Sequence, residues 1–94
     1  MTKSELVKKI SSSTGIDNAT TLAVVEAFMN EVKTSLEKGK PVFLRGFGSF
    51  MLKHRAMKTA RIISKNTTIV VPAHDIPFFK PAKEFTDSVS GKKN

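Results

Sequence analysis

The chain has 94 residues, no cysteine and a formal net charge of +8 at pH 7. A chain of this length forms one small domain, which buries a modest share of its surface and often needs a disulfide, a metal or self-association for stability. The absence of cysteine excludes disulfides and thiolate metal sites, and two histidines are too few for a closed zinc site. We therefore expect no metal and no cofactor, and we expect self-association to stabilise the fold.

Two helices are expected within residues 1–39. Thr2 and Glu5 have the spacing of a capping box, and Gly15 stops the first helix. Asp17 is a suitable N-cap for the second helix, which Gly39 would end. Apolar residues recur in this second helix at steps of three or four, and they are Leu22, Val25, Met29, Val32 and Leu36, widened by Val24 and Phe28. This face is wider than one short helix covers, which favours self-association; the alternative is that the β-segment alone covers it.

Residues 40–81 predict a small sheet with a long protruding ribbon. Pro41 opens a short strand, and Gly46 and Gly48 mark a tight turn. The stretch from Gly46 to Phe79 runs out and back as two segments of strand formers around the polar turn at residues 65–66. We expect Phe47, Phe50 and Phe43 to pack in the core, and Pro72 to mark a sheet edge or a bulge.

The last expected element is a helix from Ala82 to Val89, with Pro81 in its first turn and Phe85 and Val89 facing inward. The order of elements predicts an α+β fold within one domain, residues 1–94. It consists of a helical dimerisation base (1–39), a three-stranded antiparallel sheet with a protruding β-ribbon arm (40–81) and a short C-terminal helix (82–90).

The charge is concentrated in the predicted ribbon. No acidic residue occurs from Lys38 through His74, and the bases in this stretch are Lys38, Lys40, Arg45, Lys53, Arg55, Lys58, Arg61 and Lys65. A block of one sign on one element is typical of proteins that bind a polyanion. The alternative is a generic basic surface.

No catalytic motif is present in the sequence. Gly46 and Gly48 lack the third glycine of a phosphate-binding loop, and His54 is interpreted as a phosphate or solvent contact. We therefore expect neither an enzyme nor a small-molecule substrate. The sequence has neither an apolar signal segment nor a stretch that spans a bilayer, which predicts a cytoplasmic protein without a membrane partner.

One set of residues resembles a known family. Gly46-Phe-Gly-Ser-Phe50, His54-Arg-Ala56, Thr59, Arg61, Pro77 and Phe79 together resemble the bacterial histone-like HU and integration host factor family. The resemblance implies an architectural protein of the nucleoid that binds double-stranded DNA through the minor groove with little sequence specificity, and bends or compacts it. It also implies an intertwined homodimer, with a heterodimer with a paralogue as the alternative.

The resemblance implies DNA contacts for Arg55, Lys58, Arg61 and Lys83. The residues predicted to bind DNA are Lys3, Arg45, Lys53, Arg55, Lys58, Arg61, Ile63, Lys65, Lys80 and Lys83. Ile63 stands where the family has an intercalating proline, so it is the candidate wedge, with Ile62 as second choice. The predicted dimer core is Leu6, Val25, Phe28, Met29, Val32, Phe47, Phe50 and Phe79. The alternative function is a module that binds RNA or an acidic surface through the same arm.

Overall fold

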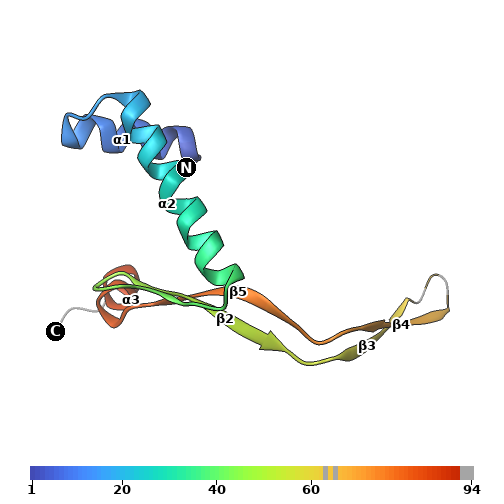
Figure 1. Ribbon diagram of the computed structural model, residues 1–94. Coiled ribbons are helices and arrows are strands. Elements are labelled where there is room, and N and C mark those ends of the chain that lie inside the picture. The colour runs from blue at the N-terminus through green and yellow to red at the C-terminus, as the bar shows by residue number, and fades with distance from the viewer. Residues whose placement is uncertain (63, 65, 92–94) are drawn as a thin grey trace.

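The structure of the chain is a computed structural model, which describes residues 1–62, 64 and 66–91. These residues form a helical pair, a small sheet with a long arm, and a last helix (Figure 1). In chain order the elements are α1 (Lys3–Thr14), α2 (Asn18–Glu37), β1 (Val42–Leu44), β2 (Gly48–Arg55), β3 (Lys58–Ile62), β4 (Thr67–Val71), β5 (His74–Pro81) and α3 (Lys83–Ser90). The α+β fold class is confirmed.

The first helix begins and ends at the predicted residues, and the second begins as predicted but ends at Glu37, with Lys38 as its C-cap and Gly39 next in the left-handed conformation. The Glu5 amide donates to Thr2 Oγ1 at 3.2 Å, and the Thr2 amide donates to Glu5 Oε1 at 3.1 Å, which completes the capping box. Gly15 ends α1 in the left-handed conformation, at φ 77°. Asp17 caps α2, and the hydrogen bond that its carboxylate accepts from the Thr20 amide lowers the pKa of Asp17 below its usual value.

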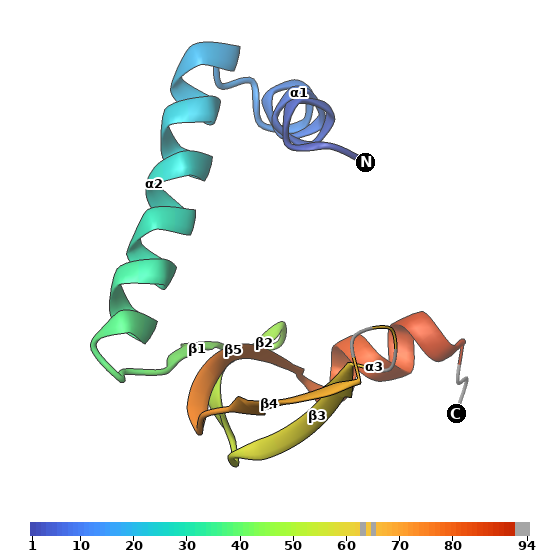
Figure 2. The ribbon, with the colours of Figure 1, turned by 90° about the vertical axis from the view of Figure 1, so that its right-hand side faces the viewer.

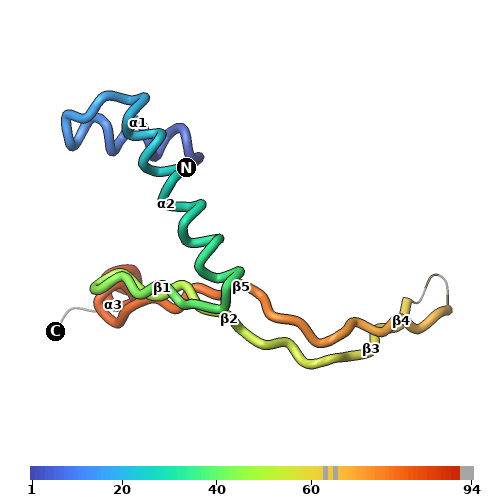
Figure 3. Tube along the Cα trace, viewed as in Figure 1, coloured from blue at the N-terminus to red at the C-terminus, as the bar shows by residue number. Residues whose placement is uncertain are grey.

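The strands form two antiparallel sheets. The pairing of β3 with β4 continues the register of the pairing of β2 with β5. β1, β2 and β5 form a three-stranded sheet in the order β1-β2-β5, and β3 pairs with β4. Pairing stops after Arg55 and His74 and resumes at Lys58 and Val71, with two residues skipped on each strand. Pro72, which has no amide hydrogen to donate, lies in this interruption, as expected for a proline at a break in a ladder. The arm is thus one long hairpin with an unpaired joint, and Figure 3 traces its two chain segments running out and back.

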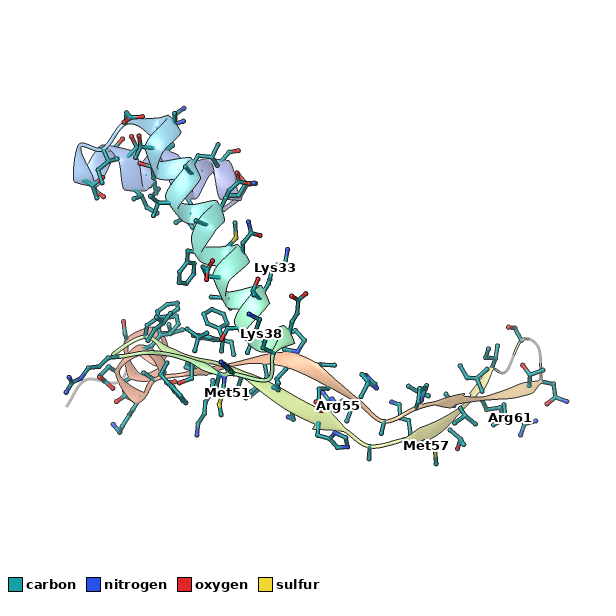
Figure 4. All side chains as sticks on the ribbon, viewed as in Figure 1. Lys33, Lys38, Met51, Arg55, Met57 and Arg61 are labelled. Atoms are coloured by element: carbon teal, nitrogen blue, oxygen red, sulfur yellow. The ribbon has the colours of Figure 1, made fainter. Side chains whose placement is uncertain are left out.

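The two faces of the three-stranded sheet differ in their neighbours. The ring of Phe50 lies 6.4 Å from that of Phe28 on α2, so Phe50 faces the helices. Side chains alternate along a strand, so those of Ser49, Met51 and Lys53 point the other way, and Figure 4 shows Met51 on the side away from α2. We call this second side of the sheet the outer face. Register assigns nine residues to the outer face, namely Phe43, Ser49, Met51, Lys53, Arg55, His74, Ile76, Phe78 and Lys80.

A phenylalanine cluster joins the sheet to α2 and α3. The ring of Phe79 lies 5.0 Å from that of Phe50 and 5.2 Å from that of Phe47. Phe47 in turn stacks on Phe85 of α3 at 5.2 Å. Such pairs add about 0.5–1.5 kcal/mol beyond the area that they bury. The cluster therefore fixes α3 against the sheet. Phe50 and Phe85 are half-buried in it, as predicted, whereas Phe47 stays 45% exposed in the single chain.

The single chain leaves much of its apolar surface open. Its accessible surface is 7819 Å², whereas a compact monomer of this mass exposes about 5,400 Å². Its radius of gyration is 18.8 Å, against about 12 Å for a compact domain. Figures 1 and 2 show the reason: α2 rises from the sheet and carries α1 at its far end, while the arm extends in another direction.

Three sequence-based expectations near the sheet edges were wrong. Pro81 is the last residue of β5, paired with Gly48, and not the first turn of a helix. The Ala82 amide donates to the Phe47 carbonyl at 2.9 Å, which keeps Ala82 extended as the N-cap, so α3 begins at Lys83. Val89 is 75% exposed and Phe43 is 70% exposed, so neither lies in a core of this chain. Phe43 is exposed because alternation along β1 places it on the outer face.

Gly48→Ala should destabilise the fold. A β-carbon at this buried position would lie 2.5 Å from Cζ of Phe79 and 2.6 Å from the carbonyl oxygen of Lys80. The carbonyl belongs to the β2–β5 pairing and cannot move aside freely, so we expect a loss of about 1–3 kcal/mol in the free energy of unfolding. Urea unfolding at fixed protein concentration measures it. Ser49→Ala on the same strand is the control, and equal midpoints for the two variants would contradict the prediction.

Candidate nucleic-acid interface

The arm carries three exposed bases of the predicted interface. Arg55 ends β2, and Lys58 and Arg61 lie on β3, all with exposed side chains. Figure 4 shows Arg55 and Arg61 well apart along the arm. Since the stretch from Lys38 through His74 lacks acidic residues, the part of the arm between Arg55 and His74 presents only basic charges to a polyanion.

The tip of the arm has its own internal contact. The Arg61 guanidinium donates to the side-chain oxygen of Asn66. Asn66 has φ 49°, the left-handed conformation that its residue type tolerates, so its predicted place in the turn is confirmed. Ile62, the second choice for a wedge, pairs with Thr67 and is half-buried. Ile63 and Lys65, both predicted to bind DNA, lie outside the described residues.

Further bases lie on or beside the outer face of the sheet. The Lys53 ammonium lies 5.0 Å from the ring centre of Phe78. Lys80 and Arg45 line a surface groove of about 400 Å³ together with Lys83, the first residue of α3. Lys83 is also paired with Asp87 at 2.7 Å, an exposed pair that costs little to break. The outer face therefore continues the basic surface of the arm.

Lys3 lies apart from the other predicted DNA-binding residues. Its ammonium is 2.8 Å from the Glu26 carboxylate, so the pair joins α1 to α2. Figure 1 shows the N-terminus beside the helical pair, away from the arm. The structure therefore brings Lys53, Arg55, Lys58, Arg61 and Lys80 onto one ribbon, and it does not bring Lys3 to them.

Both histidines have local partners. His54 Nδ1 lies 2.9 Å from the Asp75 carboxylate, directly across the β2–β5 ladder. His74 Nδ1 lies 2.8 Å from the Pro72 carbonyl oxygen, at the joint of the arm. Within the described part of the chain, no three side chains of histidine, cysteine, aspartate or glutamate come together as metal ligands. His54 thus has a carboxylate partner rather than only the solvent or phosphate that the sequence suggested.

The predicted dimer-core residues divide into those that are buried or half-buried within the single chain and those that are exposed. Val32 is already buried within the chain, and Phe50 and Phe79 are half-buried in the phenylalanine cluster. The exposed members are Leu6, Phe28, Met29 and Phe47, at 42%, 44%, 39% and 45%. Val25 is half-buried on the same helix as Phe28. An apolar surface of this kind on a small chain is typical of an unpaired interface.

The comparisons with known proteins agree with this geometry. The family model described as bacterial DNA-binding protein matches residues 1–90. The chain belongs to this family. The family includes HU and integration host factor, as the sequence resemblance indicated. Among described residues, none of the helices is long and apolar enough to cross a membrane.

Relatives in this family are similar over almost the whole chain. Integration host factor subunit beta of Marinobacter nauticus is 38% identical over 91 residues, which are 96% of this chain and 93% of the relative. Integration host factor subunit alpha of Actinobacillus pleuropneumoniae is 34% identical over 93 residues, 99% of this chain and 95% of the relative. A cocrystal structure of Anabaena HU with DNA superposes with a TM-score of 0.92 at 28% identity, covering 98% of this chain and all of the other.

Sequence reasoning missed one part of the outer face. Phe78 is 39% exposed, and with Phe43 it places two aromatic rings among the bases of that face. The strand alternation that assigns Phe50 to the helices would have assigned both residues to the opposite side. The signal was present, but the usual preference of phenylalanine for cores outweighed it.

Proposed function

We propose that this protein is an architectural DNA-binding protein of the bacterial nucleoid, which holds duplex DNA with its arms and bends or compacts it with little sequence specificity. The observation that carries the proposal is the acid-free outer part of the arm, from Arg55 to His74, with Arg55, Lys58 and Arg61 exposed along it. Such side chains neutralise phosphates, and phosphate contacts carry no sequence information. We assign the two-stranded arm to the minor groove because HU and integration host factor, to which the chain is similar, bind DNA there.

The proposed working unit is a dimer. The exposed apolar residues of α1, α2 and the sheet motivate it, because a monomer would leave this surface in water. Residues 1–39 would serve as the dimerisation base, residues 40–81 as sheet and arm, and residues 82–90 as the closing helix. A homodimer is the simplest assembly, and the subunit names of the integration host factor relatives make a heterodimer with a paralogue the alternative.

Two further parts of the proposal concern activity and place. The family is one of DNA-binding architectural proteins. For this chain we propose no catalysis, no cofactor and no small-molecule substrate, since its predicted site residues are cations and apolar side chains. A protein that packages DNA acts at the nucleoid, so we propose a cytoplasmic, nucleoid-associated location.

The function is tested on short duplexes of unrelated sequence. Fluorescence anisotropy reports the affinity, and energy transfer between dyes at the two duplex ends reports the bend. We expect similar affinities for all sequences and higher end-to-end transfer on binding. In parallel titrations, duplex RNA and anionic vesicles are tested as competitors of the DNA for the protein. Stronger competition by RNA or vesicles than by DNA would favour the alternative function and contradict this one.

Ile63 is proposed as the wedge that opens a base step. Isoleucine is among the apolar side chains that kink duplexes this way, at an unstacking cost of a few kcal/mol. We therefore expect Ile63→Ala to reduce end-to-end energy transfer strongly while lowering affinity by less than about tenfold. Arg61→Ala should lower both, because it removes a phosphate contact. If saturating Ile63→Ala protein bends the duplex as far as the wild type does, Ile63 is not the wedge.

A further inference from the structure

The tip of the arm holds a cation through a neutral side chain. The Arg61 guanidinium donates to the side-chain oxygen of Asn66, and both residues are exposed. Lys83, another residue predicted to bind DNA, is paired instead with the Asp87 carboxylate at 2.7 Å. A carboxylate offsets the charge of the base that it contacts, whereas an amide leaves that charge unchanged. The contact with Asn66 therefore orders Arg61 without weakening its attraction for a phosphate.

The turn itself does not require an asparagine at position 66. The pairing of β3 with β4 ends at Ile62 and Thr67, so Asn66 lies in the turn directly before β4. Its φ of 49° is in the left-handed region, which asparagine tolerates but glycine adopts more readily. Figure 4 shows Arg61 on the outer part of the arm, near this turn. The side-chain amide of Asn66 therefore needs a separate explanation, and its contact with Arg61 supplies one.

The chemistry of the pair leaves most of its donors available. A guanidinium carries only N–H donors, so the atom that it contacts on Asn66 is the amide oxygen. This bond uses one donor of Arg61, and the NH₂ group of Asn66 lies on the other branch of the amide. Phosphate oxygens accept hydrogen bonds from both side-chain types. The pair thus presents donors, and the full charge of Arg61, to the DNA backbone.

Ordering a long side chain before binding raises affinity. A mobile side chain with many rotamers loses that freedom at an interface, which lowers affinity by about two- to twelvefold. Resting on the proposed DNA-binding function, we propose that Asn66 is a positioning residue for Arg61, which holds the guanidinium at the tip of the arm in the orientation that contacts DNA. A dimer has two arms, so the effect on affinity counts twice.

Asn66→Gly separates this contact from the turn. Glycine keeps the left-handed conformation and removes the amide, so the thermal transition measured by circular dichroism should be unchanged. Fluorescence anisotropy should show affinity for a short duplex falling about fivefold, the lower end of the range above taken over two arms. The salt dependence should keep its wild-type slope because no charge is lost. If Asn66 served only the turn, the glycine variant would bind as well as the wild type or better.

Asn66→Asp is the matched variant for charge. Aspartate also tolerates the left-handed conformation and keeps an oxygen for Arg61, but it adds a negative charge at each tip. The slope of log affinity against log salt should therefore become less steep by about two units in a dimer.

A double variant distinguishes positioning from a direct contact of Asn66 with DNA. If Asn66 acts through Arg61, adding Asn66→Gly to Arg61→Ala should change affinity by less than about 1.5-fold. If Asn66 binds phosphate through its own NH₂ group, the fivefold loss should appear with and without Arg61.

The free protein gives a measurement that does not involve DNA. The arginines of the chain are Arg45, Arg55 and Arg61, so its guanidinium Nε–H groups give few NMR signals. Nitrogen relaxation should show the Nε–H group of Arg61 to be more mobile in Asn66→Gly than in the wild type. Arg45 and Arg55 are the internal references and should not change.

Failure of this proposal is distinguishable from failure of the proposed function. Wild-type affinity of Asn66→Gly, or an equal loss with and without Arg61, would reject the positioning role while duplex binding stands. Unchanged relaxation of Arg61 in Asn66→Gly would reject it as well. A wild-type protein that binds no duplex would reject the proposed function itself, whatever the relaxation of Arg61 shows.

Discussion

Phe28→Glu is expected to leave the chain without a stable folded dimer at micromolar concentration. Phe28 contacts Phe50 at 6.4 Å between ring centres and is 44% exposed in the single chain, so it lies between the chain's own core and the open apolar surface. Losing a large aromatic side chain at such a site costs about 3–5 kcal/mol, and a charge brought into the interface adds a desolvation cost. Small domains have only about 5–15 kcal/mol of stability in total.

Light scattering and circular dichroism measure this effect together. The wild type should have twice the mass of one chain, and the variant should lose its cooperative thermal transition or scatter as an unfolded monomer. Asn30→Glu is the matched control, because it adds the same charge to the same helix at an exposed polar position. A well-folded wild-type monomer at micromolar concentration would contradict the dimer, as would a fully folded dimer of Phe28→Glu.

Removing the charge of the arm is expected to have the largest effect on DNA binding. In a dimer, the triple change Arg55→Ala, Lys58→Ala and Arg61→Ala removes six cations. Each neutralised phosphate contributes about −0.9 to the slope of log affinity against log salt, so the slope should become less steep by about five units. At moderate salt this corresponds to a loss of about three orders of magnitude in affinity or more, alike on unrelated sequences.

A control variant that loses the same number of charges elsewhere separates the effect of the arm from the effect of the overall net charge. Lys8→Ala, Lys9→Ala and Lys33→Ala remove the same number of cations from α1 and α2, and Figure 4 shows Lys33 on α2 rather than on the arm. Anisotropy titrations at several salt concentrations should give this control nearly the wild-type slope. If both triple variants lose affinity equally, binding depends on overall charge, and the arm has no special role.

Several local features of the fold were predictable from single residues and their spacing. The capping box of Thr2 and Glu5, the stop at Gly15 and the N-cap at Asp17 are decided by hydrogen bonds within four residues. Asn66 adopts the left-handed turn conformation that its side chain tolerates. The acid-free arm was evident from charge order alone, and its position in the structure follows from the hairpin that the sequence pattern indicated.

Other features depended on contacts between distant parts of the chain. Pro81 was read as a helix start, a valid local signal, but the pairing of β5 with β2 keeps it in the strand. The ladder resumes in the same register beyond Pro72 because both strands skip two residues, and neither segment encodes that match alone. Lys3 carries the charge expected of a DNA contact, yet packing of α1 on α2 places it beside Glu26.

Composition and spacing thus indicated the helices, the turn and the charge of the arm, because each of these depends on residues near one another in sequence, while a resemblance of motifs indicated the family. Only the tertiary structure decided which side of the sheet each phenylalanine occupies. All seven phenylalanines have the same preference for burial. Phe50 is half-buried because α2 covers its side of the sheet. Phe43 and Phe78 stay exposed because the register places them on the other side, which none of the described helices covers.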